Sequence, residues 1–169
     1  YRLKKNWLTW GIVAYFIAIG LSCLVGVDFN LSFWGNAERM LGLFHLTHFL
    51  LFYLILITVM RTPRDWNHFF DVSIVVSVLI VLHGLANNYP AATIGNAAYV
   101  AGLMIFNIAF AVWRLISCKE WYGKVLFSLA LVLLLIGFIR ADISGAYAGL
   151  VIGAISAGVI YFLVQNKKK

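Results

Sequence analysis

Residues 33–49, FWGNAERMLGLFHLTHF, gather polar side chains that could do chemistry in an otherwise apolar chain. Glu38 and Arg39 are adjacent, and His45 and His48 follow within ten residues. A guanidinium group offers a rigid pair of donors that suits phosphate or carboxylate. The pattern predicts two alternatives for Arg39, which are an anion-binding site and an interfacial ion pair with Glu38.

The two histidines lie three residues apart, so on a helix they share one face. Zinc ligation would need one or two further ligands, and His83 is the only obvious candidate, so we predict no metal and no other cofactor. Two interpretations stay open for His45 and His48. They either pack inside a helix bundle with hydrogen bonds to neighbours or water, or they face a substrate and handle protons.

A second arginine, Arg140, stands at the end of a long apolar run with Asp142 nearby. The same alternatives apply to it, an anion site or an ion pair. Residues 86–96, ANNYPAATIGN, are uncharged and rich in asparagine, proline and glycine, which is typical of an ordered turn. Amide side chains there can contact sugar hydroxyls, and Asn96 either does this or caps the following helix.

The elements that position these residues are predicted to be membrane helices. Hydrophobic residues make up 63% of the chain and charged residues 11%, against roughly 25% charged in soluble domains, and the mean hydropathy is +0.94. A bilayer core of about 30 Å needs about 20 apolar residues in a helix. Strands of such length would leave backbone groups unpaired in lipid. We therefore predict an all-α fold with six transmembrane helices at residues 7–27, 42–60, 68–86, 97–117, 122–139 and 145–164.

The basic residues set the orientation of these spans. Of the 13 lysines and arginines, eleven fall on one side of the predicted spans, and Arg39 and Arg140 fall on the other. The positive-inside rule places the eleven in the cytoplasm, and with them both termini. The basic residues are not gathered on one face with interleaved aromatics, so no nucleic-acid partner is predicted. Asp71 lies within a turn of the inner boundary and is expected to reach cytoplasmic water.

The last predicted helix carries Gly145, Gly149 and Gly153 at four-residue spacing. Small residues on one stripe let two helices approach closely in lipid, so a helix partner is expected there. The partner is either another protein or the remainder of a longer chain. The sequence lacks an initial methionine and ends on three lysines, and we expect residues 1–169 to be a single transmembrane bundle that forms part of a larger protein.

Three short motifs together resemble a known membrane family. They are WGxxERMxGL at residues 34–43, IGN at 94–96 and SGAYAGL at 144–150. Their order, spacing and sidedness resemble the O-antigen ligases and related polymerases of bacterial surface polysaccharide. The resemblance runs from about Ser32 to the C-terminus.

The resemblance implies a helical glycosyltransferase of the bacterial inner membrane. Such enzymes move a glycan from an undecaprenyl-diphosphate carrier to an acceptor at the outer face, without nucleotide sugar or an essential metal. It implies that Arg39 lies near the carrier's diphosphate and that Asn96 matches the motif asparagine. Ser144 stands where the family has an arginine, and Arg140 lies one helical turn earlier.

Family members also continue into a long outer loop with catalytic residues and further helices. The resemblance therefore implies that the catalytic residues lie outside this chain, that the full-length parent is the enzyme, and that this part alone is inactive. Two other functions stay open. A transporter portion would require ionisable groups near the bilayer midplane and broken helices. A non-catalytic membrane scaffold would use the glycine stripe.

Overall fold

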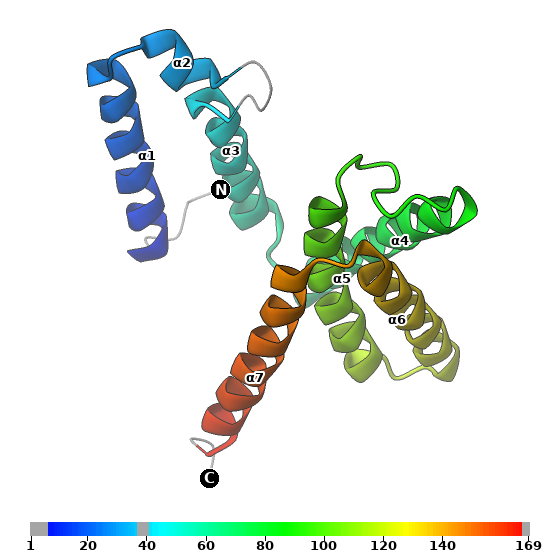
Figure 1. The fold of residues 1–169 in the computed structure, drawn as a ribbon. Coiled ribbons are helices and arrows are strands. Elements are labelled where there is room, and N and C mark those ends of the chain that lie inside the picture. The colour runs from blue at the N-terminus through cyan, green and yellow to red at the C-terminus, as the bar shows by residue number, and fades with distance from the viewer. Residues whose placement is uncertain (1–6, 37–40, 167–169) are drawn as a thin grey trace. The chain divides into compact units, whose positions relative to one another are not determined.

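A computed structural model describes residues 7–36 and 41–166, and within them the fold is all-α, as the sequence predicts (Figure 1). The described residues form seven helices and no strand. The helices are α1 Trp7–Val25, α2 Phe29–Trp34, α3 Leu43–Val59, α4 Pro63–Ala86, α5 Ala97–Ser117, α6 Trp121–Ala141 and α7 Ser144–Asn166.

Four of these helices, α1, α4, α5 and α6, are long and apolar enough to cross a membrane. Large apolar side chains are exposed along these helices, such as Ile17 on α1 and Val132 on α6, as is expected for helices in contact with lipid. Helix α3 has 17 residues, and the described apolar part of α7, Ser144–Ile160, is also shorter. The chain is therefore that of a membrane protein, and the further claim of six spans stays a prediction.

The chain divides into two compact units, Tyr1–Trp66 and Asn67–Lys169. The boundary falls inside the first turn of α4, so that helix begins in the first unit and continues in the second. The sequence predicts one bundle over the whole chain, and this stays a prediction.

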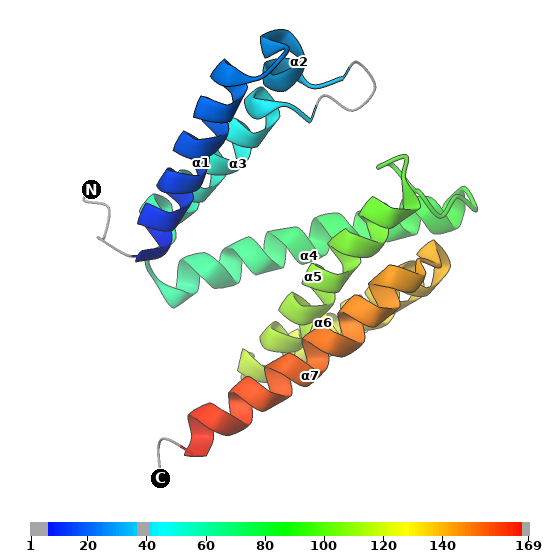
Figure 2. The same cartoon turned by 60° about the vertical axis from the view of Figure 1, so that its left-hand side comes forward.

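In the first unit, α1 and α3 pack together and the short helix α2 joins them (Figures 1 and 2). The hydroxyls of Thr9 and Tyr53 are 3.0 Å apart and link the two long helices. The sequence analysis did not predict α2. It forms because the carboxylate of Asp28 accepts a hydrogen bond from the amide of Leu31 at 3.0 Å and so caps the helix start.

In the second unit, α4, α5 and α6 share one apolar core, and the first turns of α7 pack against it (Figure 2). The buried residues of the core come from these helices and from the loop between α4 and α5. They are Ile74, Val81, Ala92, Val100, Ala101, Met104, Ile108, Ala111, Leu134, Phe138 and Ala141. On α5 they recur every three or four residues, which is the period of one helix face.

Helices α4 and α6 touch closely where Val81 meets Gly137. A Cβ added at position 137 would overlap a methyl group of Val81, so only glycine fits this crossing. The glycine makes room for the side chain of Val81, as small residues do between membrane helices. The crossing lies near the end of α6 that carries Arg140.

Asp71 forms an ion pair in the contact between two helices while its side chain stays partly exposed, and the expectation that it reaches cytoplasmic water stays a prediction. The carboxylate of Asp71 on α4 accepts two hydrogen bonds from Arg114 on α5, at 2.5 Å from Nε and 2.9 Å from Nη2. The Asp71 side chain is 34% exposed and that of Arg114 is 15% exposed. The two charges satisfy each other in the helix interface because a carboxylate matches the guanidinium fork.

Candidate functional site

The loop that carries Glu38 and Arg39 is closed at its base by two glycines. Gly35 ends α2 with φ = 81°, a conformation that favours glycine. A Cβ at Gly42 would overlap the carbonyl of Phe33 and the amide nitrogen of Gly35, so the backbone segments at the two ends of the loop lie in contact. Glu38 and Arg39 themselves lie outside the described residues. Gly35 and Gly42 are the two glycines of the WGxxERMxGL motif. Gly35 provides the positive φ, and Gly42 provides the close approach of the backbone.

The two histidines follow this loop on the first turns of α3. His48 is exposed, its Nδ1 donates a hydrogen bond to the carbonyl of Phe44 at 2.9 Å, and its ring meets that of Phe44 edge-on. Because a carbonyl can only accept, Nδ1 carries the proton and Nε2 remains available. His45 is half-buried with its ring edge-on to Phe49 at 5.1 Å. Both contacts are to rings one turn away on the same helix, so they do not decide between the two interpretations, and both stay predictions.

The loop between α4 and α5 is an ordered turn, as its composition predicts. The amide of Tyr89 donates to the carbonyl of Gly84 at 2.9 Å, and the amide of Ala92 donates to the carbonyl of Tyr89 at 2.9 Å. Asn88 and Ala92 both have φ = 48°, in the left-handed region. Ala92 is buried, so the loop folds down onto the ends of the helices.

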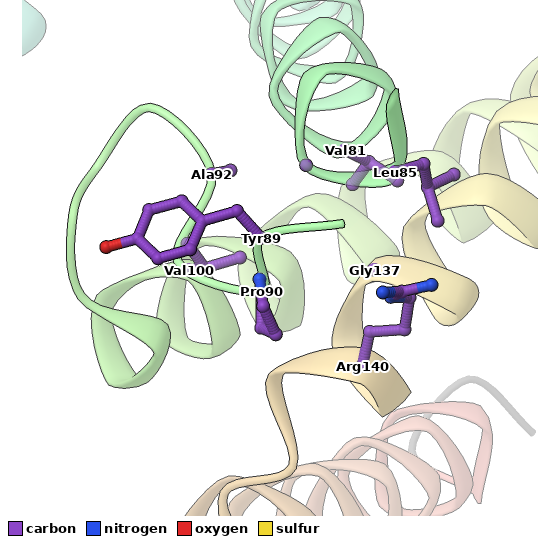
Figure 3. Close-up of a pocket in the computed structure, with 9 residues that line it drawn as sticks. Val81, Leu85, Tyr89, Pro90, Ala92, Val100, Gly137 and Arg140 are labelled. Carbon is purple, nitrogen blue, oxygen red and sulfur yellow. The ribbon is translucent and has the colours of Figure 1, made fainter. Parts of the chain in front are cut away.

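Arg140, at the end of α6, is exposed and reaches this loop. Its Nη2 donates a hydrogen bond to the side-chain oxygen of Asn88. In Figure 3 the guanidinium faces the end of α4 near Leu85, with Pro90 beside it. These residues line a depression with an open volume of only about 10 Å³, about the size of one water molecule. The site is thus a surface feature and not a deep pocket.

The charge of Arg140 is not neutralised within the described chain. Asp142, the left-handed C-cap of α6 (φ = 49°), forms no ion pair with it within the described residues. The partner, Asn88, is a neutral amide. A guanidinium that is oriented by a neutral acceptor keeps its full positive charge for an anion.

Asn96 caps α5. Its side-chain oxygen accepts a hydrogen bond from the amide of Ala98 at 2.9 Å, which satisfies a free donor of the helix start. Asn96 does not line the depression beside Arg140. The structure therefore brings Arg140 to the turn at Asn88 but gives Asn96 a separate capping role, and contact between Asn96 and a sugar stays a prediction.

Sequence reasoning missed three residues that the structure makes prominent. Asn88 belongs to the predicted amide-rich turn but was not recognised as the partner of Arg140, 52 residues away. Ser77 and Asn107 are buried in the second unit, and their side-chain oxygens have no hydrogen-bond partner among the described residues. The signal for Asn107 was available, since it is the only asparagine within residues 97–117.

Among the described residues, no group of three or more His, Cys, Asp or Glu side chains is placed to hold a metal ion. Comparison with protein-family models, with curated proteins and with solved structures finds no match to this chain.

Proposed function

We propose that the chain is the membrane-embedded part of an O-antigen-ligase-like glycosyltransferase. The full-length protein transfers a glycan from an undecaprenyl-diphosphate carrier to an acceptor at the outer face of the bacterial inner membrane. The observation that carries the proposal is the environment of Arg140, whose exposed guanidinium is oriented by the neutral side chain of Asn88.

The position of Arg140 supports an anionic ligand. It stands at the end of an apolar helix that is long enough to cross a membrane, where a charge meets lipid headgroups or water. An arginine that only served an ion pair would be expected beside a carboxylate, but Asp142 does not pair with it. A diphosphate offers the oxygens that a guanidinium binds with two hydrogen bonds.

The proposed topology has six spans with both termini in the cytoplasm. Four helices meet the length and hydropathy that a span requires, and α3 and α7 supply the other two. In this topology Arg39 and Arg140 stand on the outer face, opposite all the other basic residues, where the positive-inside rule disfavours them. A diphosphate at the outer face explains why positive charge is kept there.

The proposed chemistry is a substitution at the anomeric carbon of the carrier-linked sugar. A hydroxyl of the acceptor forms the new bond to this carbon, the bond from the carbon to the carrier's diphosphate oxygen breaks, and the hydroxyl proton passes to a base. The leaving diphosphate gains negative charge, which Arg39 and Arg140 would stabilise. The base belongs to the expected remainder of the protein.

The helices do not favour the transporter alternative. Transport sites commonly use helices that are interrupted near the midplane. Helices α4, α5 and α6 are each continuous over their described length, and the ion pair of Asp71 with Arg114 lies toward one end of α4.

Glycan transfer by the full-length protein tests the proposal. We expect Arg140→Ala and Arg39→Ala each to lower transfer by about 10²-fold or more, the loss typical when one stabilising donor is removed. Arg140→Lys keeps the charge but not the fork, so its loss is smaller. Arg64→Ala, an exposed arginine at the start of α4, is the matched control and should retain transfer. Unchanged transfer in both alanine variants at positions 39 and 140 would refute the diphosphate role.

A further inference from the structure

An open groove of about 440 Å³ lies between α4 and α6, apart from the candidate site. The helices touch at Val81 and Gly137, and the groove lies to one side of this crossing. Nine of its ten lining residues are apolar, including Val75 of α4 and Leu129 of α6, and the tenth is Asp71. Its volume is within the range of about 300–1,000 Å³ that ligand pockets commonly have.

The dimensions of the groove suit one hydrocarbon chain. Its lining on α4 extends from Asp71 to Leu79, which is about 12 Å at 1.5 Å per residue. The hydrocarbon depth of one leaflet is about 15 Å, half of the bilayer core. Both helices are long and apolar enough to cross a membrane, so acyl chains are the medium around them. A single acyl chain therefore matches the groove in length and polarity.

In the proposed topology the end of the groove at Asp71 lies on the cytoplasmic side, near the start of α6. Trp121 and Tyr122, both exposed, stand at the start of α6 as interfacial aromatic residues do. The guanidinium of Arg114 lies 4.9 Å above the ring of Phe127, which lines the groove.

Lys124 supplies a further charge at this end. It precedes Phe127 by three residues and so shares its helix face. Lys124 and Lys119 form no ion pair within the described residues. This end thus carries three positive charges, on Arg114, Lys119 and Lys124, and two negative charges, on Asp71 and Glu120. Its net charge is +1.

The geometry points to a binding site for an anionic phospholipid, with one acyl chain in the groove between α4 and α6 and the phosphate beside Lys124. The lysine attracts the phosphate of the headgroup. The apolar walls of the groove contact the acyl chain in place of neighbouring lipid chains. This site is independent of the proposed transfer reaction and lies on a different part of the second unit from Arg140.

Retention of lipid by the purified full-length protein tests this site. The protein is incubated with equal amounts of phosphatidylglycerol and phosphatidylethanolamine that carry the same chains, exchanged into detergent, and weighed intact by native mass spectrometry. We expect the wild type to retain phosphatidylglycerol in preference. Leu129→Trp fills the groove and should lower retention about 16-fold by displacing roughly two methylene groups, each worth about fourfold. Val75→Trp fills it from α4 and should act alike.

The matched control is Leu163→Trp on α7, because Leu163 is 55% exposed and Leu129 is 58% exposed. It should retain lipid as the wild type does. Lys124→Gln should reduce the preference for phosphatidylglycerol about fivefold, the contribution of one lysine near an anionic surface. Thermal unfolding that matches the wild type confirms that each variant folds.

Four results would overturn the proposal. Equal retention in Leu129→Trp, Val75→Trp and wild type would place the lipid elsewhere. Equal retention of the two lipids by the wild type would remove the role of the lysine. A change of oligomeric state in the groove variants would assign the groove to a second copy of the chain. In a parallel incubation with equal amounts of phosphatidylglycerol and a polyprenyl phosphate, preferred retention of the polyprenyl phosphate would assign the groove to a carrier tail.

Discussion

The backbone of Gly42 lies directly against the amide nitrogen of Gly35, so the loop that carries Glu38 and Arg39 begins and ends at one place. The contact allows no side chain at position 42. Gly35 adds a positive φ that a larger residue would adopt only with strain. The two glycines thus bring the described ends of this segment, residues 35 and 42, into contact.

Gly42→Ala tests this closure. The added methyl group meets backbone atoms that cannot move aside cheaply, so we expect a loss of about 1–3 kcal/mol in the free energy of unfolding. Glycan transfer by the full-length protein should fall as well. Gly20→Ala on α1 is the control, because a Cβ there has nothing within 4 Å, and it should raise stability by up to about 1 kcal/mol. Equal stability of the two variants, measured by thermal unfolding in detergent, would contradict the closure.

Asn96 should tolerate another capping residue. Asn96→Ala removes the acceptor for the Ala98 amide and should cost about 1 kcal/mol. Asn96→Ser keeps a capping oxygen and should retain stability within a few tenths of a kcal/mol. If capping is its only role, Asn96→Ser also keeps glycan transfer. A serine variant that unfolds normally but loses transfer would show that the Asn96 amide contacts the sugar.

The pair of Arg114 and Asp71 should stabilise the contact between α4 and α5. Its partial burial places it between exposed pairs and fully buried ones, so Arg114→Ala or Asp71→Ala should cost about 1–3 kcal/mol of unfolding free energy. The double variant should cost less than the sum of the two, because the charges depend on each other. Lys119→Ala, at an exposed position, is the control and should change stability by less than about 0.5 kcal/mol. Additive losses in the double variant would show that the pair contributes nothing.

Much of the helical fold follows from local patterns of residues. Residues 97–117 are mostly apolar between Asn96 and Cys118, and α5 spans these same positions. The start of α4 was predicted five residues too late, at residue 68. Pro63 takes the first helical position, and the carboxylate of Asp65 accepts hydrogen bonds from the amides of Arg61 and Thr62. A proline that looks like a loop residue therefore begins the helix.

The contacts of the candidate site were less predictable than its residues. Arg140 was selected because it breaks the charge bias, but its partner Asn88 lies 52 residues away, and no local pattern links them. The ion pair of Asp71 with Arg114 was not predicted either, because the two residues lie 43 positions apart in the sequence. The sequence predicted two alternatives for Asn96, a helix cap and a contact with a sugar. The hydrogen bond from the Ala98 amide supports the cap. Pairings between helices depend on packing, which periodicity alone does not specify.

Arg140 faces the outer side of the membrane in the proposed topology, and labelling in intact spheroplasts tests this directly. Arg140→Cys and, separately, Lys119→Cys are placed in a protein with Cys23→Ala and Cys118→Ala, then treated with a membrane-impermeant maleimide. Lys119 precedes α6 at its other end and is the control. We predict that position 140 is labelled from outside and position 119 only after the membrane is permeabilised. Labelling of position 119 from outside, with position 140 protected until permeabilisation, would contradict the topology and the proposed diphosphate site.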